Sequence, residues 1–415
     1  FTGQAARQLL ISELKGATGD SEVTEAELLA IYTQGVTYLQ GRDIYNAAGT
    51  GVTAVPVSAE TSFTLVQSDY ADVFTGAGSK DLAGKTAGCD NELSADEFIG
   101  WNVATLVACD GESTPTYHDA PYSLMLEWIS GAADGKVDTT LGLDYSQLFQ
   151  KFLLGAVAYS QTAEDYLAAD HDSSGKGLKA SNAVDTDEQD PDAYTSLEHA
   201  WDEGFGYFGA SLDYLSIEDA TIATDKVNQS DVSGEFEIDL LKGEYNYGLA
   251  QYASKHDVMT ATTDLSNEIM VAFLEGRQLI TDNHGTTPVV GDALHTRLAG
   301  ISDRAVKGLE KVIAISVVKY INATIEQVNA YVAEGDVTNL AKYWSELKGF
   351  ALGLQFNPSP VLSFADQITL HSKIGQSPIT EMGSDKAAYI TKLEEARTLV
   401  VEAYGFDATA AEAWN

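Results

Sequence analysis

The chain is 415 residues long, enough for a large core and for about two or three domains. It carries 62 Asp and Glu against 24 Lys and Arg, a formal net charge of −38, so its surface repels nucleic-acid phosphates and anionic lipid. At 44% hydrophobic residues it is too apolar to be disordered. The apolar run 312–318, broken only by Ser316, is far shorter than a bilayer span. The sequence therefore predicts neither a nucleic-acid partner nor a transmembrane segment.

Two features bear on the compartment in which the protein works. Cys89 and Cys109 are the only cysteines, and their number and spacing are compatible with one disulfide, the alternative being two buried free thiols. The chain begins at Phe1 without an initiator methionine, as expected if a targeting segment has been removed or the sequence has been trimmed to an ordered core. With the acidic surface, these features predict a secreted, periplasmic or lipid-anchored protein.

Helical periodicity dominates the first half of the chain. Apolar residues at spacings of three and four predict helices over 3–15, 24–39, 95–108, 120–131 and 143–168. An irregular insertion near 49–92, rich in Gly, Ser and Thr, interrupts this pattern. Its apolar strings at 53–57 and 61–66 suit a short ribbon, but we do not expect a sheet.

The second half is more regular. The same periodicity predicts helices over 239–256, 265–280, 292–333, 336–353, 362–374 and 384–404. The segment 292–333 is either one very long helix or two, with an interruption around Gly300–Ser302. The run 312–318, apolar except for Ser316, predicts a fully buried stretch. We expect an all-α fold of two helical bundles, an N-terminal one over 1–210 and a C-terminal one over 211–415.

The sequence lacks the common catalytic motifs. It contains no HExxH, GxSxG or P-loop, so none of these motifs supports a hydrolase or a P-loop nucleotide-dependent enzyme. The segment 170–181 begins like a calcium loop, but Ser181 stands where that loop requires a bidentate Glu. We therefore favour a solvated loop there.

One histidine has carboxylates at helical spacing. In SLEHAWDEGFGYFG, residues 196–209, His199 is followed by Asp202 at i+3 and Glu203 at i+4, on the same helix face. An imidazole with carboxylates suits iron, zinc or manganese. If the helix ended at Gly204, both acids would lie at its negative end, where a cation or an arginine would offset their charge. The alternative is an amphipathic helix whose polar residues are only solvated or hydrogen-bonded.

A few other polar residues bear on this site. Arg277 and Arg304 are potential carboxylate partners, because few basic residues serve many acids. Asp292 and His295 begin a second-half helix and are further candidate ligands.

The segment HAWDEGFGYFG resembles the GxHxxE signature of the imelysin and iron-regulated-protein-A superfamily. With the opening Phe1-Thr2-Gly3-Gln4, it is also similar to a related bacterial envelope family of unknown function that has an HxWDE-GfGYfG segment. His199 matches the motif histidine, and Asp202 falls where the motif has Glu, which leaves Glu203 as an alternative ligand. Ser196-Leu197 replaces the leading Gly-x.

This resemblance implies two bundle-like halves, a bacterial cell-envelope location and a role in iron uptake. We expect a protein that binds a divalent or trivalent metal ion, such as iron, or a metal-carrying ligand. The ligands would be His199, Asp202 and Glu203, with no catalytic residues and with other envelope uptake components as partners. One alternative is a metallohydrolase of the imelysin peptidase type, with Glu203 as base to a metal-bound water. Another is a non-catalytic protein- or glycan-binding module in which the segment is purely structural.

Overall fold

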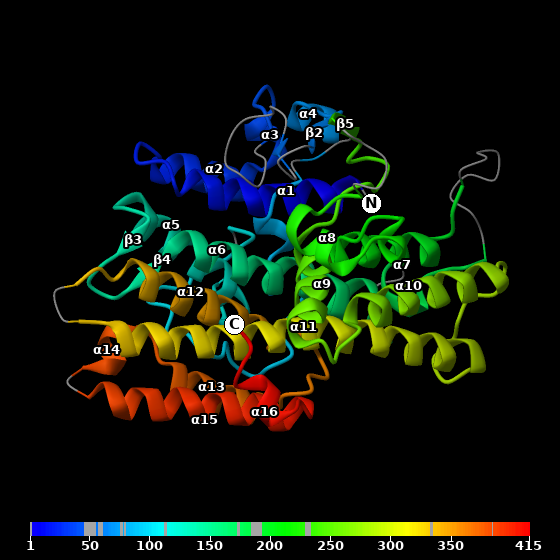
Figure 1. Cartoon of the computed structure of the whole chain (residues 1–415). Coiled ribbons are helices and arrows are strands. Elements are labelled where there is room, and N and C mark those ends of the chain that lie inside the picture. The colour runs from blue at the N-terminus through cyan, green and yellow to red at the C-terminus, as the bar shows by residue number, and fades with distance from the viewer. Residues whose placement is uncertain are drawn as a thin grey trace. The chain divides into compact units, whose positions relative to one another are not determined.

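Helices make up most of the computed structural model, which describes residues 2–44, 55–56, 61–74, 78, 80–111, 114–171, 175–183, 193–228, 234–332, 335–383 and 385–415 (Figure 1). The all-α fold class is thereby confirmed. The α-helices of these residues are α1 (Thr2–Ala17), α2 (Glu25–Gln34), α3 (Val36–Leu39), α4 (Tyr70–Val73), α5 (Ala120–Ala133), α6 (Tyr145–Leu153), α7 (Ser196–Phe208), α8 (Asp219–Asp225), α9 (Gly248–Thr260), α10 (Leu265–Asp282), α11 (Ala293–Ala330), α12 (Thr338–Gly353), α13 (Phe364–Ile374), α14 (Pro378–Met382), α15 (Lys386–Tyr404) and α16 (Ala408–Ala411).

The remaining described elements are short strands, 3-10 turns and π-helical stretches. The strands are β1 (Val55–Pro56), β2 (Thr61–Leu65), β3 (Val137–Asp138), β4 (Leu143–Asp144) and β5 (Gly234–Ile238). The 3-10 turns are η1 (Ala83–Lys85), η2 (Tyr117–Asp119), η5 (Gly177–Lys179) and η6 (Tyr214–Ser216). Two π-helical stretches, η3 (Leu154–Tyr159) and η4 (Gln161–Tyr166), continue α6, so the helix predicted over 143–168 forms with a wider second half.

Contacts within the chain define two compact units, each assembled from three stretches. Unit 1 comprises Phe1–Gln8, Thr53–Gln67 and Ala158–Val312, and unit 2 comprises Leu9–Val52, Ser68–Val157 and Ile313–Asn415. Residue 210 lies inside the third stretch of unit 1, so these units do not use it as a boundary. The two domains over 1–210 and 211–415 stay a prediction.

Unit 2 is built around the packing of α6 on α12. Gly155, just after α6, lies against Gly353 at the end of α12, where a Cβ on Gly155 would come within 2.4 Å of the Gly353 Cα. Phe152 and Phe356 meet edge to face at 5.9 Å beside this crossing. Helices α13 and α15 run side by side in the same unit (Figure 1).

Unit 1 contains a small sheet, contrary to the expectation from sequence. Strand β2 pairs antiparallel with β1 and parallel with β5, in the order β1-β2-β5. The register sets Phe63 opposite Phe236. Because β5 lies about 170 residues beyond β2, no local pattern reveals the pairing.

The helix predicted over 95–108 is wrong, because this stretch is irregular throughout. The Cys89–Cys109 disulfide, which confirms the pairing of the two cysteines, closes it into a loop. Its backbone N–H groups donate hydrogen bonds to side chains outside the loop. The Ile99 amide donates to Gln355 at 2.8 Å, and the Ala104 amide donates to Glu127 at 3.1 Å. These bonds replace the ones that a helix would supply.

One helix boundary differs from prediction, and one alternative that the sequence left open is resolved. The helix predicted from residue 239 begins only at Gly248, because 239–247 form turns that include Gly243 at a φ of 67°. Helix α11 runs without interruption, because the Ser302 hydroxyl donates to the Leu167 carbonyl at 2.6 Å instead of capping a new helix. Its stretch 312–318 is fully buried, as predicted. Within the described chain, α11 and every other helix is too short or too polar to cross a membrane.

Candidate functional site on helix α7

Helix α7 carries the HAWDE segment and begins and ends at recognisable caps. Thr195 and Glu198 form a capping box, in which the Glu198 amide donates to the Thr195 hydroxyl and the Thr195 amide donates to the Glu198 carboxylate. The helix ends at Gly209, whose φ of 83° suits a left-handed cap. Asp202 and Glu203 therefore lie more than one turn before the C-terminus of the helix, where the helix dipole destabilises their negative charge only slightly.

Helix α10 packs closely against α7 at one glycine. A Cβ on Gly276 would come within 1.9 Å of Cζ2 of Trp201, which is fully buried. The Trp201 indole N–H donates to the Phe273 carbonyl at 2.9 Å, and its ring meets the Phe273 ring edge to face. This contact fixes the distance between the helices, and it places Arg277, the next residue, against the polar face of α7.

Arg277 pairs with two carboxylates of α7. Its Nη1 lies 2.7 Å from Glu198 Oε1, and its Nε lies 3.0 Å from Asp202 Oδ1. Glu198 is buried, so this guanidinium compensates a carboxylate that water does not solvate. Desolvation nevertheless raises the pKa of Asp202, since the attraction of Arg277 only partly opposes it. Arg277 is thus a carboxylate partner, as the sequence predicts.

His199 and Glu203 form a second pair on the same face. His199 Nε2 lies 3.5 Å from Glu203 Oε2, and 47% of the histidine side chain is exposed. The Tyr194 ring stacks on the imidazole at 4.9 Å. Gln4 donates to the other Glu203 oxygen at 2.8 Å. Burial, with a hydrogen bond to Glu203 as a smaller cause, raises the pKa of Tyr166.

The three predicted ligands therefore divide into two groups. His199 and Glu203 face each other, whereas Asp202 is held by Arg277. Among the residues that the structure describes, no three His, Cys, Asp or Glu side chains are grouped so that they would hold a metal ion. Metal binding by His199, Asp202 and Glu203 stays a prediction.

The other candidate ligands have structural partners. Asp292 caps the start of α11, where its carboxylate accepts the His295 amide at 2.6 Å, and these backbone hydrogen bonds lower the pKa of Asp292. The His295 ring bonds to the Ala169 carbonyl at 2.7 Å. Arg304 pairs with Glu275, as the sequence predicts for a carboxylate partner.

In the segment that begins like a calcium loop, the described charged side chains pair within the protein. Lys179 pairs with Asp170 at 2.9 Å. Lys176 and His171 both contact Asp165, a buried carboxylate that precedes the loop. Residues 172–174, which include two of the expected ligand positions, lie outside the described residues.

Several contributors to this site are not evident from the spacing argument. Gln4 and Tyr166 reach Glu203 from distant parts of the chain, and no local signal reveals such contacts. Glu198 was visible in principle, because Thr195-Ser196-Leu197-Glu198 is a capping-box sequence that places this carboxylate at the start of the helix.

The fold and this face together define an all-α protein with a paired, partly exposed polar cluster on one helix. The chain belongs to the family described as a domain of unknown function (DUF4856), whose model matches residues 131–369, more than half of its length. That match includes all of α7 and α10. No curated protein and no solved structure matches the chain. The resemblance to imelysin stays a prediction.

Proposed function

We propose that the chain is an imelysin-like cell-envelope protein that binds iron or another cation without catalysis, through His199 and Glu203 of α7. The observation that carries the proposal is the 3.5 Å between His199 Nε2 and Glu203 Oε2. Two ligand atoms that each lie about 2.0–2.2 Å from a tetrahedral ion are about 3.4 Å apart. A cation therefore fits between these two atoms with no rearrangement of the helix.

The neighbours of the pair suit metal ligands. Gln4 holds the other oxygen of Glu203, and Tyr194 stacks on the imidazole, so both side chains are oriented from outside the pair. Asp202 is excluded from the proposed ligand set because Arg277 occupies its carboxylate.

Two protein ligands leave half of a tetrahedral coordination shell open. The remaining positions would be taken by water or by donor atoms of a metal-carrying ligand. Because nearly half of the His199 side chain is exposed, such a ligand could approach from solvent. An open shell suits uptake and hand-over of a cation to other envelope components. The Cys89–Cys109 disulfide supports the proposed location, since disulfides persist in oxidising compartments.

The test is metal retention by the whole chain. The protein is dialysed against Zn²⁺, and separately against Fe²⁺ without oxygen, and its metal content is measured after unbound metal is removed. We expect one bound equivalent, lost in His199→Asn and in Glu203→Gln but retained in Asp202→Asn. His284→Asn, which changes another exposed histidine of unit 1, is the matched control and should keep the metal. Equal metal in the wild type and His199→Asn contradicts the proposal.

A further inference from the structure

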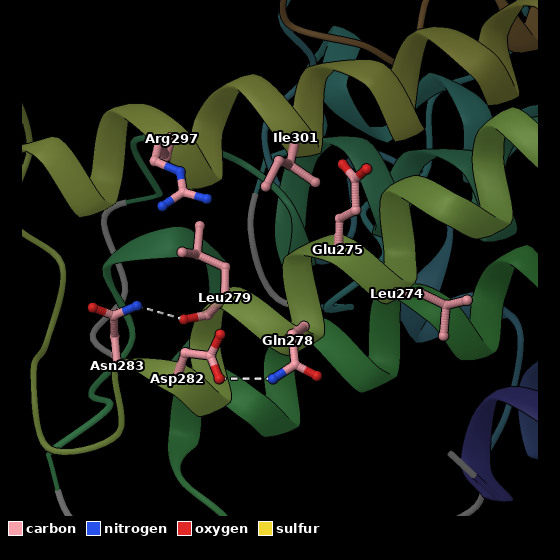
Figure 2. Close-up of a pocket in the computed structure, with 8 residues that line it drawn as sticks. All are labelled: Leu274, Glu275, Gln278, Leu279, Asp282, Asn283, Arg297 and Ile301. Carbon is pink, nitrogen blue, oxygen red and sulfur yellow. Dashed lines mark hydrogen bonds between the residues drawn. The ribbon is translucent and has the colours of Figure 1, made fainter.

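A second candidate site lies in unit 1, on α10 and the first turns of α11. An open pocket of about 700 Å³ lies between these two helices (Figure 2). A volume in this range accommodates a small molecule. The pocket has an apolar part formed by Leu274, Leu279 and Ile301, and 50% of Leu274 is exposed.

Arg297 is the unusual member of this lining. Figure 2 shows its guanidinium directed into the gap between the helices, toward Leu279. Arg297 is exposed, and within the described part of the chain no carboxylate lies within 4.0 Å of it and no acceptor hydrogen-bonds it. This is notable in a protein with 62 acidic and 24 basic residues, where a free guanidinium has many potential partners.

The remaining polar side chains of the pocket already interact with neighbours. Glu275 pairs with Arg304, and Gln278 donates to one oxygen of Asp282 at 2.7 Å. The Asn283 amide donates to the Leu279 carbonyl at 2.8 Å. Asp282 keeps its second carboxylate oxygen for another donor, so the pocket offers one cation and one anion beside an apolar surface.

We propose that this pocket binds a small zwitterion with apolar side chains, an amino acid or a dipeptide. The ligand carboxylate pairs with Arg297, its ammonium with Asp282, and its side chains lie against Leu279 and Ile301. The protein's net charge of −38 favours a zwitterion over a net anion, because the surrounding field repels the anion whereas it leaves a neutral ligand unaffected.

The test is calorimetric titration of the whole chain with Leu-Leu and with free leucine, which separates the dipeptide from the amino acid. N-acetyl-Leu-Leu lacks the ammonium and Leu-Leu amide lacks the carboxylate, so each should bind roughly tenfold more weakly than Leu-Leu. Arg297→Gln should weaken Leu-Leu by a similar factor and leave the amide unchanged. Asp282→Asn should weaken Leu-Leu and leave the N-acetyl form unchanged.

Lys307→Gln is the matched control, since it removes a positive charge from the same helix at an exposed pair with Asp303. It should bind Leu-Leu as the wild type does, and thermal melting should show that all three variants are folded. Three results overturn the proposal: no binding of either zwitterion, equal binding by Arg297→Gln, or N-acetyl-Leu-Leu binding as tightly as Leu-Leu. None of these depends on the metal experiment, which concerns His199 and Glu203 of α7, and neither residue lines the pocket.

Discussion

Two clusters of ionisable residues differ in how their charge is compensated: one forms ion pairs, and the other is buried without a carboxylate partner in the described part of the chain. On α7 and α10 of unit 1, carboxylates and Arg277 pair at a partly exposed surface. In unit 2, Lys348 of α12 and His371 of α13 are both buried and lie 3.2 Å apart. The ammonium or amine of Lys348 also donates to the Gly375 carbonyl at 2.6 Å. No carboxylate hydrogen-bonds this second pair within the described residues.

Burial decides the protonation of the second cluster. Desolvation lowers the pKa of Lys348 to about 7, although the charge of Glu381 acts in the opposite direction. Desolvation, and then the nearby Lys348, lower the pKa of His371, whose Nε2 is buried without a hydrogen-bond partner. An acidic chain thus keeps paired charges at the surface of one unit and two bases that tend to be neutral in the core of the other.

The largest effect is expected where α10 meets α7. Gly276→Ala places a methyl group 1.9 Å from the buried Trp201 ring, so the helices must separate or the indole must move. We expect a loss of about 3 kcal/mol in the free energy of unfolding, measured with urea. Gly300→Ala is the matched control, because nothing lies within 4 Å of a Cβ there, and it should be neutral or stabilising. Equal effects of the two substitutions would mean that the close packing on Trp201 is absent in solution.

The buried base predicts a pH dependence of stability. Lys348 has a pKa of about 7 in the folded state and an ordinary pKa of about 10.4 when unfolded. Between these values the unfolded state holds a proton that the folded state lacks, so stability rises with pH across this window. The contribution is about 1.4 kcal/mol per pH unit at most, or about 2–3 kcal/mol between pH 7.5 and 9.5.

This contribution is isolated by substitution. Urea midpoints of the wild type and of Lys348→Met are measured at each pH. The wild type should gain stability with rising pH relative to Lys348→Met, which lacks this contribution. Lys342→Met, on the same helix, is the control and should keep the wild-type slope. Identical slopes in the wild type and Lys348→Met would refute a neutral amine in the core.

The smallest effect tests the surface cluster. Arg277→Gln leaves the buried Glu198 carboxylate without its guanidinium, and we expect a loss of about 1–3 kcal/mol. Arg304→Gln breaks a pair in which both side chains are about half exposed, so the loss should be about 0.5 kcal/mol. Urea unfolding in low and high salt separates the two, since salt weakens the exposed pair more. A smaller loss for Arg277→Gln than for Arg304→Gln would contradict this assignment.

Local periodicity predicted most of the helices because the apolar face of a helix is formed by residues that are close together in the sequence. It failed at 95–108, where a disulfide and side chains such as Gln355 replace helical hydrogen bonds. It also failed to predict the sheet, because β2 and β5 are far apart in the chain. Both failures come from partners that a short window of sequence does not contain.

For the α7 site, the spacing of His199 and Glu203 correctly placed the two side chains together. Spacing alone did not separate Asp202 from them, because the side on which α10 approaches depends on Gly276 and Trp201. The contact from Gln4 is equally nonlocal. Helical spacing predicts which residues share a face, whereas the partner of each residue depends on tertiary packing.

The disulfide-closed loop also packs against the core amine. Gly100 lies so near the His371 ring that a Cβ there would come within 2.5 Å of it, and the next residue, Trp101, has its ring centre 5.7 Å from Lys348 Nζ. Lys348 is fully buried, so a lysine-acylating reagent reaches it only when the elements packed on it, this loop among them, open. The disulfide between two half-buried cysteines thus bears on the chemical reactivity of a nitrogen in the interior.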